Sequence, residues 1–156
     1  MQTLYPIVLS LHNITRWLVL IFGILAVVRA FAGWLGKREN GPASRRAGML
    51  FASMMDIQLL LGLILYFALS PITLSAFRDF GAAMQVADTR YFAVEHLTIM
   101  LLAVILIHVG SAVAKKAKSV VAEQRTRAIY YTLALLLVIG GIPWYRPLLR
   151  LFGIEI

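Results

Sequence analysis

Ionisable side chains interrupt a stretch of this sequence that is otherwise apolar. Residues 91–110 read YFAVEHLTIMLLAVILIHVG and carry Glu95, His96 and His108. Such groups are costly inside a bilayer, so they usually face other helices or mark a functional site. Two further apolar stretches contain polar residues of the same kind, namely His12, Asn13 and Arg16 in one and Asp56 and Gln58 in the other.

The depths of these residues in membrane-crossing helices sort them into two groups. With a rise of about 1.5 Å per residue, His12 and His96 lie about 5 Å below one membrane surface. Asp56 lies about 12 Å above the opposite surface, which is close to the level of His108. The sequence therefore predicts an outer cluster of His12, Arg16, Glu95 and His96, and an inner pair of Asp56 and His108.

The outer cluster has the residue types that a bis-histidine haem requires. Haem b takes two imidazoles from facing helices, and His12 and His96 share a level. Arg16 lies one turn from His12 on the same face, where it would meet a haem propionate. A cofactor-free polar clamp is the alternative, with Arg16 and Glu95 as an ion pair and side chains filling the space between the histidines. A zinc or copper site is weaker, because no two histidines are three or four residues apart.

The inner pair allows two interpretations. Asp56 and His108 are expected to lie within reach of each other, because an unpaired charge in hydrocarbon is costly. They form either a neutralising pair that lets two helices pack or a step of a proton relay. The first is favoured, because no further acidic residue continues a path from them toward the basic loops.

The elements that position these residues are four apolar stretches, at 7–31, 47–69, 91–113 and 128–144. Each is near the length of about 20 residues that crosses a bilayer as a helix. The chain is 61% hydrophobic over 156 residues, which indicates a membrane protein with a single domain, residues 1–156. The absence of cysteine excludes disulfides, thiolate metal sites and iron–sulfur clusters.

Charge predicts the orientation. The net charge is +8, and most of the basic residues lie in the connections 36–46 and 114–127. By the positive-inside rule these connections face the cytoplasm, so both termini face outward. Anionic lipid headgroups are the expected partners of the basic residues, and nucleic acid is not. The connection 70–90 is either a short interfacial helix or an ordered loop.

Four motifs together resemble a known family. They are SLHNITRW, QLLLGLILYFALSP, RYFAVEHLTIMLLAVILIHVG and GGIPW, and the similarity covers roughly residues 9–144. They resemble small bacterial four-helix membrane proteins labelled cytochrome b or cytochrome b-like. The resemblance implies haem and a location in the bacterial inner membrane. His12, Glu95 and His96 match the family pattern, whereas Asp56 stands where members tend to carry histidine.

These observations lead to one expected fold and three candidate functions. The fold is all-α, an up-down-up-down four-helix membrane bundle with both termini on the outer, periplasmic side. The leading function is a b-type cytochrome-like electron carrier or redox subunit without independent enzymatic activity, which exchanges electrons with quinone or a larger membrane complex. Its haem b ligands are His12 and His96, with Arg16 beside them. The alternatives are a cofactor-free accessory subunit and a small proton-coupled or quinone-interacting membrane protein; the proton-coupled form would use Asp56 and His108.

Overall fold

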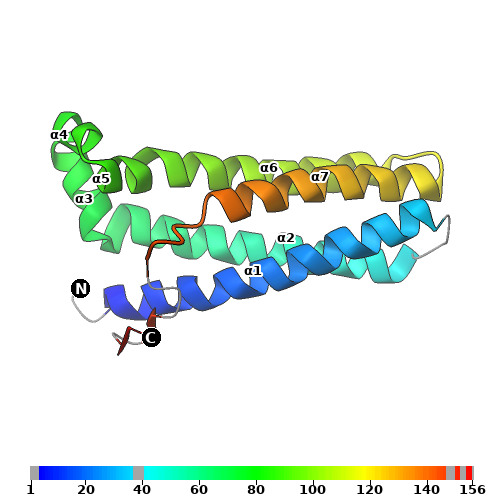
Figure 1. The fold of residues 1–156 in the computed structure, drawn as a ribbon, viewed down its shortest axis with the longest axis horizontal. Helices are drawn as coiled ribbons and strands as arrows, with labels where there is room; N and C mark the ends of the chain where they lie inside the picture. The colour runs from blue at the N-terminus through cyan, green and yellow to red at the C-terminus, as the bar shows by residue number, and fades with distance from the viewer. Residues whose placement is uncertain (1–3, 37–40, 147–149, 152–153, 156) are drawn as a thin grey trace.

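Four long helices lie lengthwise beside one another in the computed structural model, which describes residues 4–36, 41–146, 150–151 and 154–155 (Figure 1). The expected all-α class is confirmed. The described residues contain only one piece of sheet, an antiparallel pair of two-residue strands, β1 (Arg150–Leu151) and β2 (Ile154–Glu155). The long helices are α1 (Leu4–Leu35), α2 (Gly41–Ile64), α6 (His96–Lys115) and α7 (Val120–Gly140).

Three helical segments are long and apolar enough to cross a membrane, namely Leu4–Leu35, Pro42–Leu69 and Ala87–Lys115. They contain the predicted spans 7–31, 47–69 and 91–113. The fourth predicted span, 128–144, is not among them, because α7 ends at Gly140 and its first turns carry Glu123, Arg125 and Arg127. Crossing of the membrane by α7 and the alternating orientation of the helices stay predictions.

The two connections predicted as basic loops are largely helical. α2 begins at Gly41, and α7 begins at Val120 after Ser119, whose side chain caps the helix by accepting a hydrogen bond from Ala122 N. Lys37 and Arg38 lie outside the described residues. The described parts of both connections lie at one end of the molecule, opposite the end at which α1 begins (Figure 1). The described basic residues of these two connections therefore lie at the same end, as predicted, whereas Arg78, Arg90 and Arg146 lie at the opposite end.

The connection 70–90 is helical rather than an open loop, and it forms a cap at the other end of the molecule (Figure 1). Side-chain hydrogen bonds hold the base of this cap together. Thr73 of the cap donates to the Tyr66 carbonyl at 2.7 Å, and the Tyr66 hydroxyl donates to the Ala93 carbonyl at 2.7 Å, which joins the segments on the two sides of the cap. The cap consists of α3 (Pro71–Arg78), α4 (Phe80–Gln85) and α5 (Ala87–Arg90), and it joins α2 and α6 through two π-helical turns, η1 (Leu65–Leu69) and η2 (Tyr91–Glu95).

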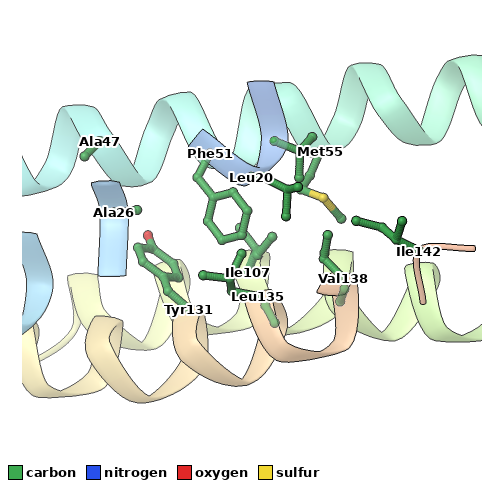
Figure 2. Packing of buried hydrophobic residues seen from close by; sticks show 13 residues of the cluster. Leu20, Ala26, Ala47, Phe51, Met55, Ile107, Tyr131, Leu135, Val138 and Ile142 are labelled. Carbon is green, nitrogen blue, oxygen red and sulfur yellow. The ribbon is translucent and has the colours of Figure 1, made fainter. Parts of the chain in front are cut away.

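The core combines a few large side chains with many alanines. Phe51 of α2 and Tyr131 of α7 meet edge to face, with ring centres 5.9 Å apart. Figure 2 shows Phe51 pointing inward among Leu20, Ile107 and Leu135. Small residues let the helices approach closely, which is how helices pack where the surroundings are as apolar as the core. The exposed residues are also largely apolar, for example Ile21, Ile24, Val28, Leu133 and Leu136, which suits a lipid environment.

A polar network joins α2, α6 and α7 at the basic end. Glu123 accepts hydrogen bonds from Arg45 and Arg127, each at 3.1 Å. Arg127 also donates to the Tyr131 hydroxyl at 3.1 Å, and that hydroxyl bonds Ser111 of α6 at 2.8 Å. Ser44 of α2 donates to Gln124 of α7 at 2.6 Å. The network fastens the helices at the end away from the histidine pair of the predicted outer cluster.

Candidate functional site

A cavity of about 210 Å³ lies between α1, α2 and α6 at the end of the bundle that carries the cap. Along α6 it extends from the level of His96 to Val104, and along α2 from Gly62 to Met55. Most of its wall is apolar. The polar side chains that line it include His12 and Arg16 of α1, Gln58 of α2, His96 of α6, and Arg146 beyond α7.

His12 reaches the cavity because α2 has a glycine at the point where the ring crosses it. A Cβ placed on Gly62 would lie 3.3 Å from Cε1 of His12, so any side chain there would press on the imidazole. The Gln58 backbone lies nearby, but the buried Nδ1 of His12 makes no hydrogen bond of good geometry to a described residue. Oε1 of Gln58, in the same cavity wall, also lacks such a bond. Buried polar atoms without partners are rare, and here they border an open volume.

His96 is held by the end of α7. Gly140 and Gly141 weaken the helix and Pro143 cannot continue it, so α7 ends and the Gly141 carbonyl has no helical partner. Nδ1 of His96 lies 2.8 Å from that oxygen. A carbonyl only accepts, so Nδ1 carries the hydrogen and Nε2 is left for another interaction. Tyr91 donates to the same oxygen at 2.7 Å.

The two imidazoles lie at a separation that suits one metal ion between them. Their ring centres are 6.4 Å apart and their planes are inclined by 65°. A ligating nitrogen lies about 2 Å from its metal and the ring centre about 1 Å farther, so two imidazoles on opposite sides of one ion have centres about 6 Å apart. The fixed Nδ1–H of His96 also matches the backbone hydrogen bond that liganded histidines usually make. The residues present therefore fit a bis-histidine haem.

Two arginines border this site, and the sequence identified only one of them. Arg16 was predicted and is buried, with its guanidinium over Trp17 at 5.6 Å from the ring centre. Arg146 was not predicted as a site residue. It lies 4.6 Å over the Phe92 ring and donates to Asp88 at 2.5 Å. Its place soon after the helix-ending GGIPW motif was the one signal in the sequence.

Glu95 does not belong to this site, so the expected four-residue outer cluster is wrong in one member. Its carboxylate accepts a hydrogen bond from Arg90 at 2.8 Å, and its side chain is 44% exposed. Glu95 is the last residue of the π-helical turn η2, and His96 is the first of α6. Adjacent residues on a helix point in different directions, which takes the carboxylate away from the cavity.

Asp56 and His108 meet as predicted, but not in the interior. Oδ1 of Asp56 and Nε2 of His108 are 2.8 Å apart. Each side chain is 51% exposed, so the expectation that both are buried is wrong. The pair lies on the outer surface of α2 and α6, and neither residue lines the cavity. The similar depths of the two residues in the membrane correctly predicted that they would meet. Depth does not indicate which face of a helix a residue occupies, so it could not predict that the pair faces outward.

The fold and the site define a class: a helical protein of membrane-spanning character with a two-histidine cavity under a helical cap. No group of three or more histidine, cysteine, aspartate or glutamate side chains that could hold a metal ion occurs in the part of the chain that the structure describes. No family model, curated protein or solved structure matches the chain. The functional argument therefore depends on the site itself.

Proposed function

We propose that this protein is a b-type cytochrome-like electron carrier or redox subunit of the bacterial inner membrane, with haem b held between His12 and His96. The observation that carries the proposal is the 6.4 Å separation of the two ring centres beside an open cavity. A bound haem would supply one-electron chemistry through its iron. The resemblance to small cytochrome b-like proteins agrees with this assignment.

The residues around the cavity have separate tasks in this proposal. His12 and His96 offer the two nitrogens, and the Gly141 carbonyl fixes the ring of His96. Arg16 and Arg146 provide positive charge for the carboxylates of the cofactor. The apolar remainder of the wall, such as Met100 and Ile142, keeps water from the site.

The proposed membrane arrangement has four crossings, with both termini on the periplasmic side. It is supported by three helical segments of sufficient length and apolar character and by the position of the described basic residues of both connections at the same end. Anionic lipid headgroups are the proposed partners of that end. Electron exchange would occur with quinone or with a larger membrane complex.

Two observations favour the cofactor over a cofactor-free accessory subunit. The accessory alternative requires an ion pair between Arg16 and Glu95, but Glu95 accepts from Arg90. It also requires side chains between the histidines, whereas both imidazoles border the cavity. No comparable observation favours a small proton-coupled protein.

A visible absorption spectrum of the purified full chain tests the proposal. With ample haem during expression, the wild type should show a Soret band and a reduced α band. His12→Ala and His96→Ala should each lower haem occupancy at least roughly ten-fold, because each removes one axial ligand. His108→Ala is the matched control and should keep the band, since His108 lies outside the cavity. A colourless wild type that is well folded would refute haem binding.

A further inference from the structure

The Asp56–His108 pair presents polar atoms to a region where hydrocarbon is expected. Nε2 of His108 and Oδ1 of Asp56 satisfy each other at 2.8 Å. Nδ1 of His108 and Oδ2 of Asp56 have no partner among the described residues, and both side chains are half-exposed. A polar atom without a hydrogen bond is costly in a bilayer, so a partner from outside the chain is expected here.

The depth of the pair limits what that partner can be. Asp56 lies ten residues beyond Arg46 along α2, about 15 Å from the basic end, and His108 lies about 10 Å before Lys115. The hydrocarbon core is about 30 Å thick, so both are well inside it. Phospholipid headgroups stay at the interface, and short Asp and His side chains do not extend to it. The partner must itself dissolve in the bilayer and carry a hydrogen-bonding group.

The position of the pair relative to the cavity narrows the choice further. Met55 and Val104 line the deep end of the cavity; Asp56 follows Met55, and His108 lies one helical turn beyond Val104. α2 and α6 also pack against each other less closely than α1 against α2 or α6 against α7. The pair therefore lies between two helices that are less tightly packed, α2 and α6, beside the wall of the proposed cofactor site.

We infer that the Asp56–His108 pair is a binding site for the head group of a membrane quinone, in its quinone or hydroquinone form. The neutral ring that donates Nε2–H to Asp56 leaves Nδ1 to accept a hydrogen bond from a hydroquinone hydroxyl. The protonated ring offers Nδ1–H to a quinone carbonyl. The choice of a redox-active lipid rather than another amphiphile rests on the proposed function, because an electron carrier in the bilayer requires such a partner near its cofactor.

Histidine-selective NMR tests this site directly. The chain has three histidines, so the full protein with ¹⁵N-labelled imidazoles in lipid nanodiscs gives a small set of ring signals that single substitutions assign. Titration with a decyl-tailed para-benzoquinone, and separately with its hydroquinone, should shift the His108 signals saturably. Decylbenzene has the same tail without hydrogen-bonding groups and should leave them in place.

Matched variants show whether the pair itself binds. Asp56→Asn preserves the shape of the side chain and should weaken binding roughly ten-fold, through loss of the charge that orients His108. His108→Gln should abolish saturable binding, read from the fluorine signal of a fluorinated quinone. Thr98→Val alters another exposed polar residue of α6 and serves as the control. This variant should bind the quinone as tightly as the wild type does.

Four results would overturn the inference, three of them from the titrations. These three are the absence of a saturable shift at His108, an equal shift with decylbenzene, and unchanged affinity in Asp56→Asn. A His108 signal that changes with the number of protein copies per nanodisc, before any quinone is added, would overturn it as well and assign the surface to a second copy. The titration is repeated on protein expressed with ample haem and on protein expressed without added haem, so that loss of haem binding and loss of quinone binding are distinguished.

Discussion

At the scale of single residues, the charged side chains of this protein are expected to contribute very differently to its stability. Arg127 is buried in the network at the basic end and bonds both Glu123 and Tyr131. Arg45 donates to the same carboxylate from an exposed position. Removing one partner of a buried ion pair leaves the other charge uncompensated in the interior. When an exposed partner is removed, water can take over its hydrogen bonds, so the cost is smaller.

Glu123 should therefore be the most sensitive member of this network. Glu123→Ala should lower the free energy of unfolding by about 3 kcal/mol, because Arg127 stays buried without its carboxylate. Arg45→Ala should cost clearly less. Thermal unfolding in mild detergent, followed by circular dichroism, compares the two; equal losses would mean that the buried Arg127 contact is not the main one.

The same carboxylate predicts a dependence on pH. Hydrogen bonding to Arg45, together with the charge of Arg127, holds the pKa of Glu123 below its ordinary value of 4.5, and this residue precedes the predicted span 128–144. Its stabilisation is therefore complete above pH 4.5 and is lost as the pH falls through the lowered pKa. Glu123→Gln should lack this acid-sensitive part. Asp79→Asn, which removes an exposed carboxylate without an ion pair to a described residue, should retain it.

The limits of prediction at this scale have a physical cause. Rise per residue along a helix was enough to pair Asp56 with His108 and His12 with His96. It was not enough to orient them, because lipid is as apolar as the core and the outer face of each helix carries no polar pattern to mark it. Glu95 and the outward-facing inner pair were misplaced for this reason. The Gly141 carbonyl could not be identified from the sequence, because every residue has a backbone carbonyl and no residue type marks this one.

At the scale of elements, glycines set how closely the helices approach. A Cβ on Gly110 of α6 would overlap the Cβ of Tyr130 on α7 and lie 2.7 Å from its Cγ. Gly140, at the end of α7, would meet nothing within 4 Å. The same substitution therefore has opposite expected effects at two places on one pair of helices.

Gly110→Ala should destabilise the protein by about 2 kcal/mol, because α6 and α7 must move apart to admit the methyl group. Gly140→Ala should be neutral or stabilising by up to about 1 kcal/mol, because alanine favours the helix and the space is open. Unfolding by increasing fractions of dodecyl sulfate in mild micelles measures both. A neutral Gly110→Ala would contradict the close approach of α6 and α7.

Sequence patterns located the long helices better than their ends. The apolar runs predicted α1, α2 and α6, but residues 120–127 were assigned to a loop because they are polar and basic. They are helical because Ser119 caps α7, and their polar side chains bond α2, where Arg45 donates to Glu123 and Ser44 donates to Gln124. The polarity of that segment reflected an internal network, which composition cannot distinguish from exposure to solvent.

At the scale of the whole molecule, the orientation in the membrane is testable with single cysteines, since the chain has none of its own. Ala43→Cys and Ser119→Cys lie on exposed positions at the basic end, and Ser75→Cys lies on an exposed position of the cap. An impermeant thiol reagent added to intact cells should label Ser75→Cys and leave the other two unlabelled, because lysine and arginine resist translocation. The reverse pattern would place both termini in the cytoplasm. Ser44 is unsuitable as a probe, since it is buried against Gln124.

The two π-helical turns that flank the cap determine in which direction around the helix axis the side chains of the adjoining helices point. Each π turn holds one residue more than an α turn, and η2 ends directly before His96. Each residue of an α-helix advances the next by about 100° around the axis. Removing Val94, which does not line the cavity, would therefore rotate His96, and everything after it on α6, away from His12 without removing a side chain of the cavity. The spacing of residues in this short turn, as much as their identity, keeps the two imidazoles in phase.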